Sequence, residues 1–166
     1  MPHVTIDAVV IGIGNPFRND DGIGPAVAAQ IEEQRLPGVR VVMSDGEPAG
    51  LLEAWTGAGL AVVVDAIHRM PAYPGSIHRL TASQLETGGT AASSHGLGVP
   101  DALRLGRALG QLPRRVVIFA VEAADTGAGT ELSKPVAAAL PEVVAAVMAE
   151  LNPCWPNVPL AGPDSL

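Results

Sequence analysis

Two carboxylates and one imidazole stand where a ligand site could form, at Asp21, Asp65 and His95. Asp21 lies in the turn IGIGNPFRNDDGIG, Asp65 directly follows the apolar run LAVVV, and His95 lies in the glycine-rich segment ETGGTAASSHGLG. If the apolar runs are parallel strands, all three residues fall beyond carboxyl strand ends, where open sheets bind ligands. Two carboxylates and an imidazole can hold a divalent ion and leave positions open for water or substrate. Such an ion lowers the pKa of a bound water or polarises a carbonyl.

Each of these residues also has a purely structural interpretation. Asp21 fits a favourable negative charge at a helix N-terminus. Asp65 fits a strand-end residue that accepts hydrogen bonds from backbone amides, and His95 fits a solvated loop histidine. Spacing alone leaves both interpretations open.

The glycines of the first turn match a dinucleotide-binding fingerprint only in part. Gly12 and Gly14 supply its first two glycines, but Phe17 stands at the third position, and the adjacent Asp20 and Asp21 would repel a pyrophosphate. The run Gly14-Asn15-Pro16 instead indicates a sharp turn in which the Asn15 side chain can hydrogen-bond the loop backbone. A nucleotide-binding domain stays as an alternative.

Apolar periodicity predicts an α/β fold, with a three-layer, mostly parallel twisted sheet flanked by helices. Strands are expected at residues 5–13, 39–43, 60–64 and 115–121, with an edge strand at 76–80. Helices are expected from Ile23 along the stripe Ile23, Val27 and Ile31, at 51–55, at about 100–109, and from the cap Ser133 to Leu151. Pro141 should kink or divide the last helix, and residues 86–98 should form a mobile surface loop. Three strand-to-helix steps within residues 1–65 imply right-handed crossovers.

Composition favours a single domain over residues 1–151, followed by a proline-rich tail at 152–166. The chain has 166 residues, of which 48% are hydrophobic and only 3% aromatic, so Val, Leu, Ile and Ala must fill the core. A net charge of −7 without a basic run argues against nucleic acid as a partner. No apolar run approaches membrane-spanning length. The single cysteine excludes an internal disulfide and favours the cytoplasm.

Four motifs occur in order along the chain: GIGNPFRNDDGIG before an amphipathic helix, VVVDAIHR with PGSI downstream, SSHGLGVPDAL, and the ending ELSKPVAAALPEVVAAV. Together they resemble the hydrogenase maturation proteases, over nearly the whole chain from about Val9 to Glu150. That family trims a short C-terminal extension from the large subunit of [NiFe] hydrogenases after nickel has been inserted. The resemblance therefore implies a phosphorylase/hydrolase-like fold, an endopeptidase activity and a [NiFe] hydrogenase large-subunit precursor as partner, and we expect a monomer.

The resemblance also implies a set of site residues. The three metal-binding positions of the family map to Asp21, Asp65 and His95, which become the expected catalytic residues of an aspartic-type peptidase. Nickel of the substrate is the expected recognition element, and a divalent metal at these three residues is a further expectation. Whether an aspartate or a metal-bound water serves as the base stays open. The expected substrate-binding residues are Asn15, Asp45 and Gly46.

Other hydrolase classes fit the sequence less well. Neither an HExxH helix nor a G-x-S-x-G elbow is present. The peptidyl-tRNA hydrolases share the Gly-x-Gly-Asn-Pro pattern of residues 12–16, but they continue with a tyrosine and a Thr-Arg-His-Asn run that this chain lacks. A non-catalytic module that senses nickel or acts as a chaperone for hydrogenase assembly would use the same site residues, so turnover is the discriminating property.

Overall fold

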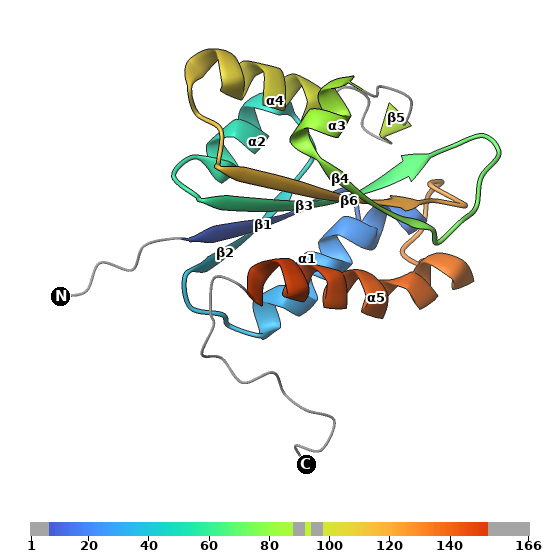
Figure 1. The fold of residues 1–166 in the computed structure, drawn as a ribbon. Helices are drawn as coiled ribbons and strands as arrows, with labels where there is room; N and C mark the ends of the chain where they lie inside the picture. Colours follow the sequence, from blue (N-terminus) through green and yellow to red (C-terminus); the bar gives the residue numbers. More distant parts are fainter. Residues whose placement is uncertain (1–6, 88–91, 94–97, 153–166) are drawn as a thin grey trace.

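The computed structural model describes residues 7–87, 92–93 and 98–152. Within these residues the chain forms a six-stranded sheet with the order β2-β1-β3-β6-β4, and β5 pairs with the end of β3. Strands β2, β1, β3 and β6 run parallel, whereas β4 is antiparallel at one edge. The predicted α/β class and mostly parallel sheet are confirmed (Figure 1).

The elements alternate between strands and helices along most of the chain. In order they are β1 (Ala8–Ile13), the short 3-10 helix η1 (Asn19–Gly22), α1 (Ile23–Glu33), β2 (Val39–Ser44), α2 (Pro48–Trp55), β3 (Leu60–His68), β4 (Ile77–Thr81), α3 (Ala82–Thr87), β5 (Ala92–Ser93), α4 (Gly98–Leu109), β6 (Arg115–Glu122) and α5 (Lys134–Leu151).

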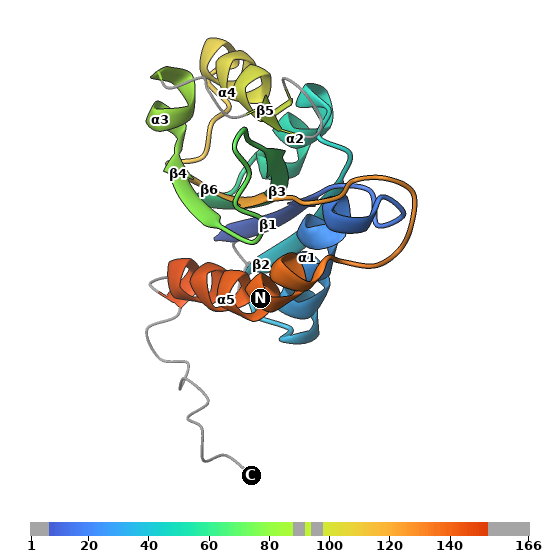
Figure 2. The ribbon, with the colours of Figure 1, turned by 90° about the vertical axis from the view of Figure 1, so that its right-hand side faces the viewer.

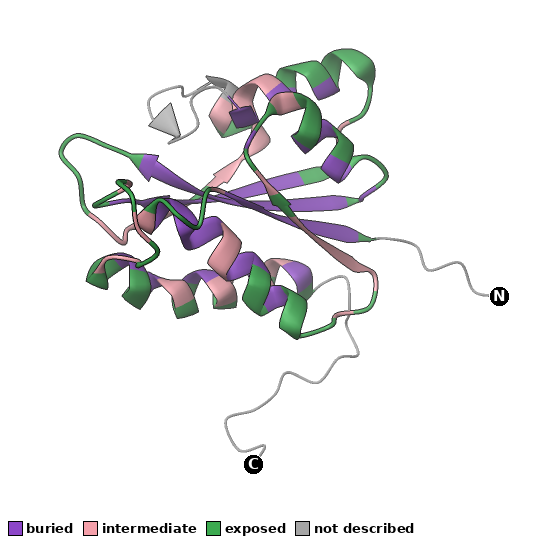
Figure 3. Ribbon diagram, turned by 180° about the vertical axis from the view of Figure 1, so that it is seen from behind, coloured by how far each residue is buried: buried purple, intermediate pink, exposed green. Residues whose placement is uncertain are grey.

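Helices cover both faces of the sheet, so that the described chain has three layers. Helices α1 and α5 pack on one face, and α2, α3 and α4 pack on the other (Figures 1 and 2). Successive strand residues point to opposite faces. In β1, Val10 therefore belongs to the hydrophobic core on the side of α1 and α5, whereas Ile11 belongs to the core on the side of α2 and α4. The inner strands are buried, and the outer helix faces are exposed (Figure 3).

Several local expectations differ from the structure. Ser133 stands at the N-cap of α5, but its side chain makes no capping bond and instead donates to Asp20. Helix α5 runs through Pro141 as one helix, so the expected division is not seen. Helix α3 was not predicted because its six residues are too few to show a helical repeat. The tail from residue 153 and most of the 86–98 loop lie outside the described residues.

Two glycines let the start of α1 pack directly on the sheet. A Cβ added to Gly24 would lie 2.7 Å from the carbonyl oxygen of Val64 in β3 and would also crowd Ile13 of β1. A Cβ on Gly12 would likewise crowd the backbone of Gly24, at 2.7 Å from its carbonyl carbon. This close approach fixes η1, which directly precedes α1, at the carboxyl ends of β1 and β3.

Gly24→Ala is therefore expected to destabilise the protein by about 1–3 kcal/mol, because the added methyl group meets backbone atoms that cannot rotate away. Gly50→Ala in α2 is the matched control, since nothing lies within 4 Å of the point that a Cβ would occupy there. That control should be neutral or more stable by about 0.5–1 kcal/mol. Urea unfolding measures both values, and equal effects at the two positions would contradict the packing account.

Candidate functional site

Asp21 lies in η1, at the rim where β1 ends and α1 begins. Its side chain is fully buried, and its Oδ2 accepts a hydrogen bond of 2.8 Å from the backbone amide of Asn15. Asn15 Oδ1 in turn accepts from the amide of Phe17 at 2.8 Å, as the sequence predicted for this turn. The glycine-rich turn thus folds around the Asp21 carboxylate.

Asp65 lies near the carboxyl end of β3 and is 3% exposed. Strand β3 is the parallel neighbour of β1, and it also contacts η1, so the elements that carry Asp21 and Asp65 meet at one rim. Alternation along β3 places Asp65 on the face of Ala61 and Val63, which is covered by α2 and α4. Two of the three predicted site residues therefore come from elements that touch.

His95, the third predicted member, lies outside the described residues. Within the part of the chain that is described, no group of three His, Cys, Asp or Glu side chains is close enough to hold a metal ion. Asp21 and Asp65 supply oxygen donors, and a histidine would complete a donor set of the type that binds divalent ions. The chemistry of the residues thus fits such an ion.

Asp20, the neighbour of Asp21, holds the segment between β6 and α5 in place. Its side chain is fully buried. Oδ2 accepts from the amides of Ala124 and Asp125 at 2.8 and 2.9 Å and from Ser133 Oγ at 2.8 Å. Oδ1 accepts from the amide of Ser133 at 2.7 Å. Sequence reasoning missed this role, since nothing in the pair Asp20-Asp21 distinguishes the two carboxylates.

The same two segments are joined by further bonds. The amide of Asn19 donates to Gly129 O at 2.9 Å, and the amide of Gly129 donates to Phe17 O at 3.0 Å. Arg18 Nε donates to Thr126 O at 3.2 Å. Gly129 has a φ of +148°, and a Cβ there would lie 3.0 Å from Cγ of Asn19. The turn that carries Asp21 is therefore fixed on two sides, by β1 and by the β6–α5 segment.

Glu122, at the end of β6, fixes the connection between β3 and β4. Its side chain is 3% exposed, and it accepts from His78 Nε2 at 2.8 Å and from the amide of Tyr73 at 3.0 Å. The hydrogen bond from His78, followed by that from Tyr73, lowers the pKa of Glu122 below the ordinary value of 4.5. Asp65 of β3 and His78 of β4 both pair with Ala120 of β6, so Glu122 and His78 lie on the same face of the sheet as Asp65.

Glu122 should make the free energy of unfolding depend on pH in the acid range. Because its folded-state pKa is lowered, its contribution is present above the ordinary pKa of 4.5 and is lost as pH falls through the folded value. Glu122→Gln should therefore be less stable than the wild type at neutral pH, with a difference that shrinks below pH 4.5. Urea unfolding across the acid range measures this, with the exposed Glu142→Gln as control for the lost charge. A difference that stays constant with pH would contradict the assignment.

A depression of about 710 Å³ adjoins the Asp21 turn at the carboxyl end of β2. It is lined by residues 14–18, 42–45 and Gly50. Asn15 and Asp45, two of the predicted substrate-binding residues, lie on it. Gly46, the third, is buried with a φ of +87°, and a Cβ on Gly98 of α4 would lie 3.1 Å from its carbonyl carbon. Gly46 therefore packs closely against the start of α4 and does not line the depression.

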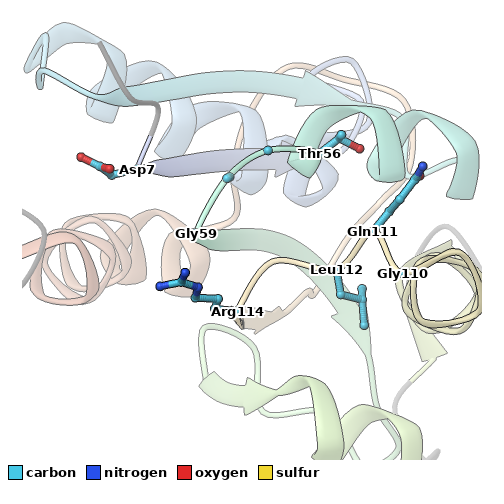
Figure 4. A pocket seen from close by; sticks show the side chains of 9 residues that line it. Asp7, Thr56, Gly59, Gly110, Gln111, Leu112 and Arg114 are labelled. Carbon is cyan, nitrogen blue, oxygen red and sulfur yellow. The ribbon is translucent and has the colours of Figure 1, made fainter. Parts of the chain in front are cut away.

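Another depression, of about 530 Å³, lies at the opposite, amino end of the strands. It is lined by Asp7, residues 56–59, residues 110–112 and Arg114. In Figure 4 its two charged side chains, those of Asp7 and Arg114, lie well apart from Gln111 around the hollow. It lacks a converging set of reactive groups among the described residues, so the rim with Asp21 and Asp65 is the better candidate site.

Comparison with known proteins gives an independent result. A sequence model of the family described as hydrogenase maturation protease matches residues 23–150. The matched range includes Asp65 and begins just after the Asp21 turn. No match was found among curated protein sequences. No helix in the described part of the chain is both long enough and apolar enough to cross a bilayer.

Solved structures share the fold. The hydrogenase maturating endopeptidase HybD from E. coli superposes with a TM-score of 0.77 at 22% identity, over 90% of this chain and 94% of that one. The [NiFe] hydrogenase maturation protease HybD from Thermococcus kodakarensis has a TM-score of 0.70 at 22% identity, over 87% of this chain and 98% of that one. HycI from Thermococcus kodakarensis KOD1, also a [NiFe] hydrogenase maturation protease, has a TM-score of 0.65 at 25% identity, over 89% of this chain and 93% of that one.

Proposed function

Because this chain belongs to the hydrogenase maturation protease family, we propose that it is the endopeptidase that removes the C-terminal extension from a [NiFe] hydrogenase large-subunit precursor after nickel insertion. The observation that carries the proposal is the family match over residues 23–150. The buried carboxylates Asp21 and Asp65 on touching elements support it, because a carboxylate can serve as the general base of peptide hydrolysis.

Peptide hydrolysis requires an activated water, a polarised carbonyl and a proton for the leaving amine. In the proposed site the carboxylates of Asp21 and Asp65 orient the attacking water and accept its proton. The water oxygen bonds to the carbonyl carbon, the carbon–nitrogen bond breaks, and the proton passes to the leaving amine. The hydrogen bond from Asn15 to Asp21 holds that carboxylate in position for these steps.

Nickel enters this proposal as part of the substrate. Asp21, Asp65 and His95 would approach the metal of the loaded precursor, and this contact would distinguish it from a precursor that lacks nickel. The same three residues would hold a resident divalent ion, which would supply polarisation of the scissile carbonyl. A cytoplasmic, monomeric enzyme is part of the proposal, since a single cysteine suits a reducing compartment.

The test is turnover. Enzyme at a small fraction of the molar amount of nickel-loaded precursor should convert all of it to the shorter form, as read by intact mass, and should leave nickel-free precursor unchanged. A chaperone or nickel sensor would bind the precursor without shortening it. An unchanged precursor mass after long incubation would contradict the peptidase assignment.

A further inference from the structure

Strand β2 presents an open edge to one side of the sheet. It is the first strand in the order β2-β1-β3-β6-β4, and no strand among the described residues pairs with its outer side (Figure 1). The amide of Gly14 donates to Ser44 O at 3.0 Å, so the backbone groups of Ser44 face β1. Because successive residues of a strand direct their N–H and C=O groups to opposite sides, those of Met43 and Val41 face outward.

The depression of about 710 Å³ lies at the end of this edge, and its walls are more apolar than polar. Val42 and Met43 line it from β2, and Pro16 and Phe17 line it from the turn after β1. The side chains of Phe17 and Met43 are 69% and 49% exposed, which is high for large apolar groups in a folded chain.

This depression adjoins the turn that carries Asp21. Asn15 lines it, and the backbone amide of Asn15 donates directly to the Asp21 carboxylate at 2.8 Å. A bound chain that leaves the depression past Asn15 therefore reaches the turn that folds around Asp21. An outward row of backbone donors and acceptors beside an apolar hollow is the arrangement that binds an extended peptide by adding a strand to a sheet.

We propose that the outer edge of β2 and this depression bind the extended segment of the precursor that flanks the scissile bond. The main chain of that segment pairs with Met43 and Val41, and an apolar side chain of the segment lies between Phe17 and Met43. The inference rests on the proposed function, because that function supplies a polypeptide as the occupant. Phe17 and Met43 thus determine substrate binding rather than the chemical step.

Binding can be measured separately from cleavage. In an Asp21→Asn background, where turnover is slowed, the dissociation constant of nickel-loaded precursor should rise about tenfold or more for Phe17→Ala/Met43→Ala. Both side chains are exposed, so folding should be unaffected. Leu109→Ala is the matched control, since Leu109 is 55% exposed at the end of α4, beside the depression at the amino end of the strands.

The backbone part of the proposal needs its own variant. Met43→Pro removes the outward N–H, which pairs with no strand among the described residues, and edge strands accept proline. It should weaken precursor binding beyond Met43→Ala. In cleaving enzyme, Phe17→Ala/Met43→Ala should raise KM with kcat within about twofold.

The outcomes separate the two proposals. An unchanged dissociation constant in Phe17→Ala/Met43→Ala, with normal trimming by the wild type, overturns the proposed peptide-binding site at β2 and leaves the peptidase assignment intact. A tenfold weaker complex between the double variant and the precursor supports this binding site even if the wild type never cleaves. If the double variant instead converts a dimer of this chain to monomers and binds precursor normally, the edge is a self-association surface and the proposal is overturned.

Discussion

Asp21→Asn is expected to slow precursor trimming by about 10²–10⁴-fold while the fold is retained. The asparagine keeps an oxygen that can accept the hydrogen bond from the Asn15 amide, so the turn stays folded. It carries no charge, cannot take a proton from water and is a poor ligand for a cation. Single-turnover rates with nickel-loaded precursor, measured by intact mass, give the size of the loss.

Asp7→Asn is the matched control for that loss. Asp7 is exposed and lines the depression at the opposite end of the strands, so its replacement changes the charge equally without touching the rim. The control should trim precursor at the wild-type rate. Normal trimming by Asp21→Asn, or equal losses in both variants, would show that the Asp21 carboxylate has no special part in the reaction.

Asp20→Ala is expected to lower the free energy of unfolding by about 3–4 kcal/mol. Four donor groups of Ala124, Asp125 and Ser133 bond to this one buried carboxylate, and the change leaves them without this acceptor. It also weakens one of the two supports of the turn around Asp21, although the bonds between Asn19, Phe17 and Gly129 remain. Urea unfolding of the purified variants measures the loss.

Asp45→Ala is the control for the stability effect. Asp45 is exposed, and among the described residues its side chain accepts one hydrogen bond, of 3.0 Å, from the amide of Glu47. Its removal should cost less than about 1 kcal/mol. A loss at Asp20 no larger than that at Asp45 would mean that the β6–α5 segment does not depend on the Asp20 carboxylate.

The contrast between Asp20 and Asp21 shows where sequence reasoning stops. Long apolar runs predicted β1, β3 and β6 because burial on both faces requires such runs. Parallel neighbours bring their carboxyl ends together, so Asp21 and Asp65 could be assigned to one rim. Adjacent carboxylates of the same type, however, acquire different roles only when the 123–133 segment folds back against η1.

Ser133 illustrates the same limit from the other side. Its position before α5 matches the preference for serine at helix N-caps. The hydroxyl instead donates to Asp20, more than a hundred positions earlier in the chain. A local preference cannot anticipate a partner so distant in sequence. Glu122 is a similar case, because its partners His78 and Tyr73 lie more than forty positions earlier in the chain.

The central claim is that Asp21 and Asp65 act on the precursor as one unit. Trimming rates of Asp21→Asn, Asp65→Asn and the double variant test it most directly. Residues that serve one step together give non-additive losses, so each single variant should lose about 10²–10⁴-fold and the double variant little more. A wild-type rate in either single variant, or a double loss equal to the product of the single losses, would contradict the claim.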